Sequence, residues 1–341
     1  MVERLADRSK EPLPSLPTAT SVHLEPSGVA VMRSGWEREA AYLFLNYGTH
    51  DSFHTHRATL DFELYAHGAP LALDAGIGLT YDDPLYLTWY VTARAHNMVV
   101  VDDVNADRAT ARGRDVLWHS DPRVDVFAAT HAGYAKSRGI THRRAIAFLK
   151  PDAFVVFDTC SAEADGHTLS WYFHSPTDLV VQPGSRVVSA AGPGVLLAAA
   201  SPEQLTAVRH GKGMCSLAEL GGYREIDWIA LDKPANRGDD NRFVVLDAAL
   251  RQSGAGGRVH RRAESAWHRV RFPATRRPHR HSDLRQWQAT DAFGWAVGHR
   301  WLLCLGTLPK WSAAREDRGR RHVDLGGSIR AAAGERREQR R

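Results

Sequence analysis

Residues 54–103 read HTHRATLDFELYAHGAPLALDAGIGLTYDDPLYLTWYVTARAHNMVVVDD. The first part alternates apolar and polar residues, which is the period of a β-strand. A turn is expected at residues 66–70 (AHGAP), after which LALDAG returns antiparallel to the first strand. A third short strand is expected at HNMVVVDD. The stretch therefore predicts three neighbouring β-strands joined by short connections.

Four polar residues in this stretch have the types and positions of metal ligands. Residues two apart in an extended chain share a face, so His54 and His56 are expected on the apolar, inward face near the strand's beginning. The returning strand brings Asp74 near that beginning, and His96 opens the third strand. Imidazole and carboxylate donors in this number suit Zn²⁺ with one position left for water. The alternative is that they are ordinary half-buried residues with backbone hydrogen bonds.

The same strand-like pattern extends well beyond this stretch. Short apolar, β-branched and aromatic runs recur from residue 28 to residue 250, separated by Gly, Pro, Asp and Asn. We expect an all-β fold, an antiparallel β-sandwich over residues 28–310, whose pattern is clearest to residue 250. Residues 1–27 are linker-like, and the Arg-rich residues 311–341 are expected to be disordered.

Composition and motifs exclude several classes. The sequence has no run of eighteen apolar residues, so we expect no membrane partner. Three scattered cysteines argue against a disulfide framework and suit a reducing compartment. The N-terminal residues lack the apolar region of a signal peptide, which favours the cytoplasm for this chain, or the periplasm if its N-terminus is truncated. No G-x-S-x-G elbow or groove-entering motif is present, so neither a serine hydrolase nor a nucleic-acid partner is expected. The formal charge of +5 favours acidic partners in general.

The order of the motifs resembles the heparinase II/III-like polysaccharide lyases, including the oligoalginate lyases. In that family HxH opens a strand with an LYAxG-like turn, an apolar strand ends in D-x-G, a Tyr-containing loop follows, and R-x-HN-x-VVVD closes the unit. The matching pieces here are His54-Thr55-His56, FELYAHG, LALDAG, the loop from Tyr81 to Tyr90, and ARAHNMVVVDD. Farther along, HRRAIAFLKPDAFVVFD and HTLSWYFHSP extend the resemblance to about residue 180.

The resemblance implies cleavage of uronic-acid polysaccharides, such as alginate or heparin, by β-elimination. A base removes the C5 proton, neutralising groups hold the carboxylate, and an acid protonates the leaving O4. It also implies a structural zinc ion, with ligands matching His56, Asp74 and His96. Ala58 stands where the family often has Asp, so weaker metal affinity is expected.

The resemblance further implies that His54 points toward the substrate and assists acid–base work. A tyrosine of the following loop shares this role, and Tyr81 and Tyr86 are the best-placed candidates. Tyr90 is the third candidate and is assigned with Arg94 to substrate binding, because an arginine can hold a substrate carboxylate. Each tyrosine could equally be plain aromatic packing.

In the family, an (α/α) toroid precedes the sheet domain and completes the active site. Only the linker-like residues 1–27 precede the first expected strand here, so we expect an incomplete lyase whose isolated chain is inactive. Its expected partners are an acidic polysaccharide or oligosaccharide and a toroid, as a missing domain or a separate polypeptide. The alternative is a non-catalytic β-sandwich that binds carbohydrate or zinc.

Overall fold

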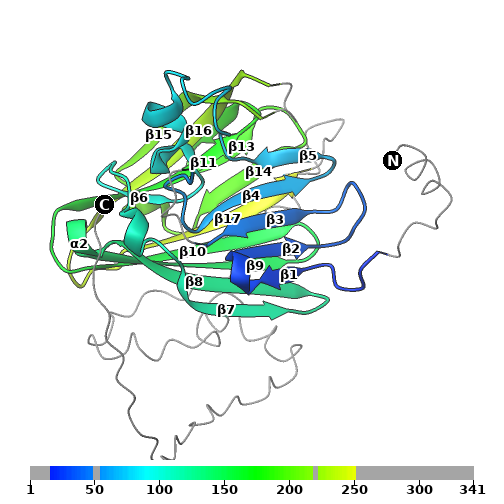
Figure 1. Ribbon diagram of the computed structural model, residues 1–341, viewed down its shortest axis with the longest axis horizontal. Coiled ribbons are helices and arrows are strands. Elements are labelled where there is room, and N and C mark those ends of the chain that lie inside the picture. Colours follow the sequence, from blue (N-terminus) through cyan, green and yellow to red (C-terminus); the bar gives the residue numbers. More distant parts are fainter. Residues whose placement is uncertain (1–15, 49–53, 218–221, 251–341) are drawn as a thin grey trace, which may run out of the picture.

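The computed structural model describes residues 16–48, 54–217 and 222–250, and the predictions for residues 251–341 lie outside this part. Three sheets, in which every strand pairing is antiparallel, carry the fold, so the predicted all-β class is confirmed (Figure 1). No helix in the described ranges is long and apolar enough to cross a membrane.

The five-stranded sheet has the order of the chain: β1 (Val22–Leu24), β2 (Val29–Arg33), β3 (Tyr42–Asn46), β4 (Asp61–Ala66) and β5 (Ala69–Ala72). The eight-stranded sheet runs β12 (Leu179–Gln182), β13 (Arg186–Ser189), β14 (Gly194–Ala199), β17 (Arg242–Leu250), β10 (Ala153–Ala162), β9 (Ile140–Leu149), β8 (Val124–Tyr134) and β7 (Arg114–Ser120). The four-stranded sheet runs β15 (Ala207–Cys215), β16 (Arg224–Ala235), β11 (His167–Ser175) and β6 (Val99–Val101). Short helical turns link them: η2 (Glu25–Ser27), η3 (Tyr86–Tyr90), η4 (Ala93–Ala95), η5 (Arg108–Thr110), α2 (Ala135–Arg138) and η6 (Pro202–Gln204).

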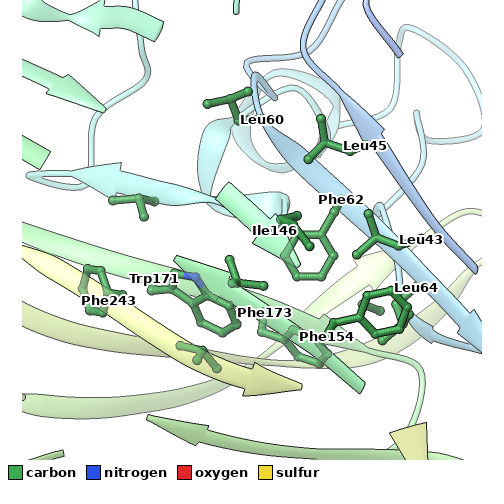
Figure 2. Close-up of a cluster of buried hydrophobic side chains, with 14 of the residues drawn as sticks. Leu43, Leu45, Leu60, Phe62, Leu64, Ile146, Phe154, Trp171, Phe173 and Phe243 are labelled. Atoms are coloured by element: carbon green, nitrogen blue, oxygen red, sulfur yellow. The ribbon is translucent and has the colours of Figure 1, made fainter. Parts of the chain in front are cut away.

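One apolar core lies between the layers (Figure 2). Alternation builds it: in β3 the side chains of Leu43 and Leu45 are buried while their neighbours are half-exposed. Across the layer they share the core with Phe154 of β10, while β11 contributes Trp171 and Phe173. The Leu73 N–H donates to the carbonyl of His174, which links the end of β5 to the four-stranded sheet. This junction lies beside the candidate site.

Two predicted boundaries need correction. The sheet begins at Val22, inside the segment predicted to be a linker up to residue 27, because Val22–Leu24 pairs with β2. The strand predicted from His54 begins only at Asp61, since Leu60 has a left-handed φ of 63° that interrupts extended backbone. The prediction that His54 and His56 lie on the inward face of that strand is therefore wrong.

The predicted hairpin is present with a shorter turn than expected. Only His67 and Gly68 separate β4 from β5, and both have positive φ, as a type I′ turn requires. The strand β5 ends at Ala72, before Asp74, and β6 begins at Val99, after His96. The candidate ligands consequently lie on the irregular segments that flank the strands.

Candidate metal centre

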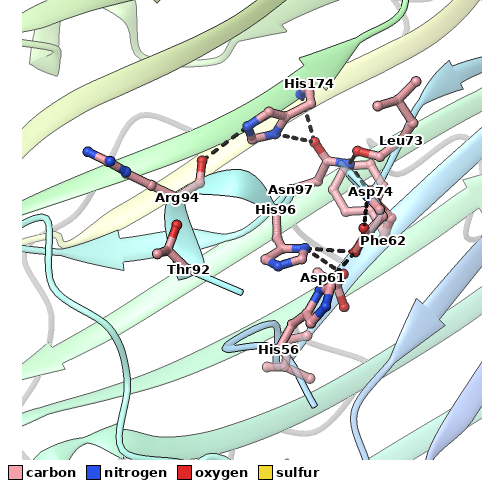
Figure 3. A network of polar contacts seen from close by, with 12 residues as sticks. His56, Asp61, Phe62, Leu73, Asp74, Thr92, Arg94, His96, Asn97 and His174 are labelled. Atoms are coloured by element: carbon pink, nitrogen blue, oxygen red, sulfur yellow. Dashed lines mark hydrogen bonds and ion pairs between the residues drawn. The ribbon is translucent and has the colours of Figure 1, made fainter. Parts of the chain in front are cut away.

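Three of the predicted ligands meet where the segment before β4, the segment after β5 and the segment before β6 come together (Figure 3). Asp74 lies between the two histidines: its Oδ2 is 2.8 Å from Nδ1 of His96 and 3.9 Å from Nδ1 of His56. One donor atom from each residue lies within 4.8 Å of the others. Two imidazoles and a carboxylate at this spacing could hold a divalent cation such as Zn²⁺.

Burial and neighbouring charges act in opposite directions on the pKa values of the three residues. The pKa of His56 is lowered because burial outweighs the attraction of Asp74. Burial acts in the same direction on His96, but the Asp74 and Asp61 carboxylates outweigh it and raise the pKa of that imidazole. For Asp74, burial is outweighed by His96 and by the Gly76 N–H, so the pKa of this carboxyl is lowered. A metal ion would have to displace a proton held between His96 and Asp74, so binding would weaken in acid.

Asp61 is a fourth acidic group beside this cluster. Its Oδ2 lies 3.8 Å from Nδ1 of His96, and the residue is only 8% exposed. Burial raises the pKa of Asp61 to about 8, against the opposing effect of His96. If residues 54–64 formed one strand, Asp61 and His56 would point to opposite faces of the sheet. The left-handed backbone of Leu60 interrupts the strand, so the two side chains are no longer on opposite faces. Sequence reasoning missed Asp61 for this reason.

The backbone around the cluster is fixed by Asn97. Its side-chain amide donates to the carbonyls of Phe62, at 2.8 Å, and Leu73, at 3.1 Å. Its Oδ1 accepts the N–H of His174 at 2.7 Å. Phe62 and Leu73 are the chain neighbours of the two site carboxylates, so a single buried amide aligns both ligand-bearing segments.

Arg144 of β9 reaches the same region from the eight-stranded sheet. This fully buried side chain donates through Nη1 to the carbonyls of Leu60, at 2.6 Å, and Asn97, at 2.7 Å. Its Nε and Nη2 bind both oxygens of Asp158, at 2.8 and 3.0 Å. Burial alone would raise the pKa of Asp158, but Arg144 and His142 hold it at about 2. The buried ion pair thus anchors the site to the core.

Two of the three predicted acid–base residues, His54 and Tyr81, are exposed. His54 is exposed, and its Nδ1 lies 2.9 Å from the Tyr81 hydroxyl. Tyr81 is 59% exposed, and its ring meets the edge of Tyr86 at 5.2 Å between centroids. Tyr86 is buried, so of the two candidates Tyr81 is the one that solvent or a polymer can reach. The catalytic roles stay predictions.

The two residues predicted to bind substrate are placed differently. Tyr90 is fully buried among Ala75, Trp89 and Ala95, and burial raises the pKa of its hydroxyl. The Tyr90 side chain has no exposed surface in this structure, and its role in substrate binding stays a prediction. Arg94 is exposed and donates to the Thr88 carbonyl at 3.0 Å. Figure 3 shows its guanidinium directed away from the cluster, and its role in binding stays a prediction.

Comparison with known proteins places the chain in a known family. The family described as "Heparinase II/III-like, C-terminal" matches residues 16–280. The heparin-sulfate lyase of Pedobacter heparinus is 27% identical over 154 residues, which are 44% of this chain and 23% of that protein. A heparin-sulfate lyase of Bacteroides stercoris is 21% identical over 259 residues, or 74% of this chain and 37% of that protein.

Solved structures share the fold. The heparan sulfate lyase HepC from Pedobacter heparinus superimposes with a TM-score of 0.61 at 20% identity, over 74% of this chain and 40% of that one. The heparinase III BT4657 gene product gives a TM-score of 0.64 at 21% identity, over 74% and 38%. The chain therefore spans between 23% and 40% of the length of these relatives.

Proposed function

Because the chain belongs to the heparinase II/III-like, C-terminal family, we propose that it is the β-sheet part of a lyase that cleaves uronic-acid-containing polysaccharides by β-elimination. The observation that carries this proposal is the exposed hydrogen bond between His54 and Tyr81. His54 lies two residues before His56, which belongs to a partly buried His–Asp–His cluster. The relatives named as heparin-sulfate lyases support an acidic polysaccharide as substrate.

The His54–Tyr81 pair suits proton transfer. An imidazole can accept the proton that β-elimination removes at C5, and a phenol can donate one to the departing oxygen. Their 2.9 Å contact joins the two groups, and their exposure leaves room for a polymer chain. His54 lies outside the strands, on the segment that also carries His56.

His56, Asp74 and His96 would hold the metal ion, which we propose is zinc. The ion would act structurally, by fixing the segment before β4 to the segments that follow β5 and precede β6. Since His56 is two residues from His54, this restraint would also fix the exposed imidazole. The metal and the proton-transfer pair are therefore parts of one arrangement in this proposal.

A complete active site also has to neutralise the uronate carboxylate. We propose that a toroid domain, in the same or in a separate polypeptide, supplies these groups and the other wall of the cleft. The lengths of the relatives support this division, since they exceed that of the matched region more than twofold. The isolated chain is then expected to bind zinc without cleaving polysaccharide.

The experiment combines metal analysis with an elimination assay. Purified protein is expected to contain about one equivalent of zinc, and His56→Ala should lose it. Ultraviolet absorbance of unsaturated uronate should not rise when the chain alone is mixed with alginate, heparin or heparan sulfate. A rise in absorbance with the chain alone would refute the proposal that a toroid domain is needed for cleavage. The His54→Ala variant would then show whether His54 takes part in that cleavage. A metal-free protein would refute the metal centre.

A further inference from the structure

Asp61 has no role in the function proposed above, yet its surroundings are those of a ligand. It is the first residue of β4, it is buried, and its Oδ1 finds no hydrogen-bond partner among the described residues. Buried polar atoms almost always have a hydrogen-bond partner, because burying one without a partner costs several kcal/mol of folding free energy. An unpaired carboxylate oxygen next to a cluster of metal ligands indicates that a cation belongs there.

The distance from Asp61 to His96 is compatible with a further ligand. In a tetrahedral zinc site with bonds of about 2.0–2.2 Å, the ligand atoms lie about 3.3–3.5 Å from each other. Asp61 Oδ2 lies 3.8 Å from Nδ1 of His96, while Asp74 Oδ2 lies 3.9 Å from His56 Nδ1 and 2.8 Å from His96 Nδ1. The Asp61–His96 separation thus falls between the two distances that join Asp74 to the histidines.

The backbone on both sides of Asp61 is held in place. The preceding carbonyl, of Leu60, accepts from Arg144, and the following carbonyl, of Phe62, accepts from Asn97. Leu60 takes a left-handed φ of 63°, which turns the chain just before the carboxylate. An unusual backbone conformation that is supported from two sides is typical of a functional constraint.

We propose that Asp61 is the fourth protein ligand of the metal centre and completes its coordination sphere. The assignment rests on the proposed metal site and changes its chemistry. Two carboxylates neutralise a divalent cation in a buried pocket, where an uncompensated charge is costly. A sphere of four protein ligands leaves no position for water, so the metal is structural and the proton transfers belong to His54 and Tyr81.

The test uses metal-free full-length protein loaded with Co²⁺, whose visible spectrum reports coordination. Wild type is expected to show tetrahedral Co²⁺ bands that added azide does not change. Asp61→Asn should bind Co²⁺ and Zn²⁺ about 10–100-fold more weakly, and its bands should respond to azide because a position has opened. Glu63→Gln, on the same strand and half-buried, is the matched control and should stay close to wild type.

Three results would overturn the assignment in distinguishable ways. Unchanged affinity and azide-insensitive bands in Asp61→Asn would remove Asp61 from the sphere and leave the three-residue centre intact. An equal loss of metal affinity in Glu63→Gln would show that the effect comes from removing any nearby negative charge. Failure of wild type to bind any metal would overturn the proposed centre itself. Thermal unfolding of the metal-free proteins excludes misfolding, since Asp61→Asn should be at least as stable as wild type without metal.

Discussion

A buried acid far from the site gives the most quantitative prediction. Asp247 lies in β17, opposite Phe154 of β10 and Leu197 of β14, and both of these neighbours belong to the apolar core. It is 1% exposed, and neither of its carboxyl oxygens has a hydrogen-bond partner in the part of the chain that the structure describes. Burial raises the pKa of Asp247 to about 8 from an ordinary value of 3.8.

The sign and size of the effect follow from this shift. Between pH 3.8 and 8 the folded protein keeps a proton that the unfolded chain releases, so the free energy of unfolding falls as pH rises through this window. Each pH unit costs about 1.4 kcal/mol, which gives about 4 kcal/mol at pH 7. Asp247→Asn keeps the shape and removes the titration. We expect a gain of about 2–4 kcal/mol at pH 7, because the buried amide still lacks partners.

Urea unfolding followed by tryptophan fluorescence from pH 4 to pH 8.5 measures this prediction. The variant should gain little at pH 4, and its stability should depend less on pH than that of wild type. Asp115→Asn is the control, since Asp115 is exposed and should change neither quantity. If the Asp247→Asn variant keeps the wild-type slope between pH 5 and pH 8, Asp247 does not hold the extra proton and the reasoning fails.

Two further predictions concern packing near the site. Arg144→Met should lose about 3–5 kcal/mol of unfolding free energy, because Asp158 stays buried without the guanidinium that neutralises it. The control is Arg143→Met, at the adjacent half-buried position, which should lose about 1 kcal/mol or less in the same urea assay. Equal losses in the two variants would contradict the argument. Gly213→Ala should lose about 1–3 kcal/mol of unfolding free energy, because the added Cβ would lie 2.1 Å from Cζ2 of Trp89. An unchanged melting temperature would contradict this prediction and show that the indole moves freely.

The fold could be predicted because it depends on regular backbone, and the three-residue cluster could be predicted because its members lie close in sequence to the ends of paired strands. Alternation in β3 gives the buried face directly, and the two-residue turn at His67 and Gly68 returns the chain so that Asp74 passes the start of β4. The residue types then indicate metal chemistry. None of these steps requires knowledge of contacts between distant segments.

Asp61 could not be predicted in the same way. Alternation assumes that every residue is extended, and one left-handed residue, Leu60, ends the relation between His56 and the strand that follows it. Nothing in the local sequence marks a leucine for that conformation, which favours glycine or asparagine. The long-range hydrogen bonds of the Leu60 carbonyl and N–H, to Arg144 and Asn46, help to hold it.

Arg144 did carry a sequence signal. Arg143 and Arg144 are adjacent in a strand, so one of them must face inward, and Ile146 and Phe148 show that the inward residue is Arg144. A buried arginine needs a carboxylate, and in the register of β9 with β10 the residue opposite it is Asp158. The pair was therefore inferable, but its reach to the Leu60 and Asn97 carbonyls depends on how the layers stack.

The supports of the site divide into two groups, and this division bears on what the metal is for. Arg144 and Asn97 bind the carbonyls of residues 60, 62, 73 and 97, all of which lie at or near the ends of strands. None of these bonds reaches residues 54–57. That segment has contacts of its own, such as the Arg57 N–H to the Val91 carbonyl and the Arg108 guanidinium to the Thr55 carbonyl, and on the proposed function His56 would add the metal. On the proposed function the ion would therefore add one restraint to this segment, through His56, two residues from the His54 that contacts Tyr81.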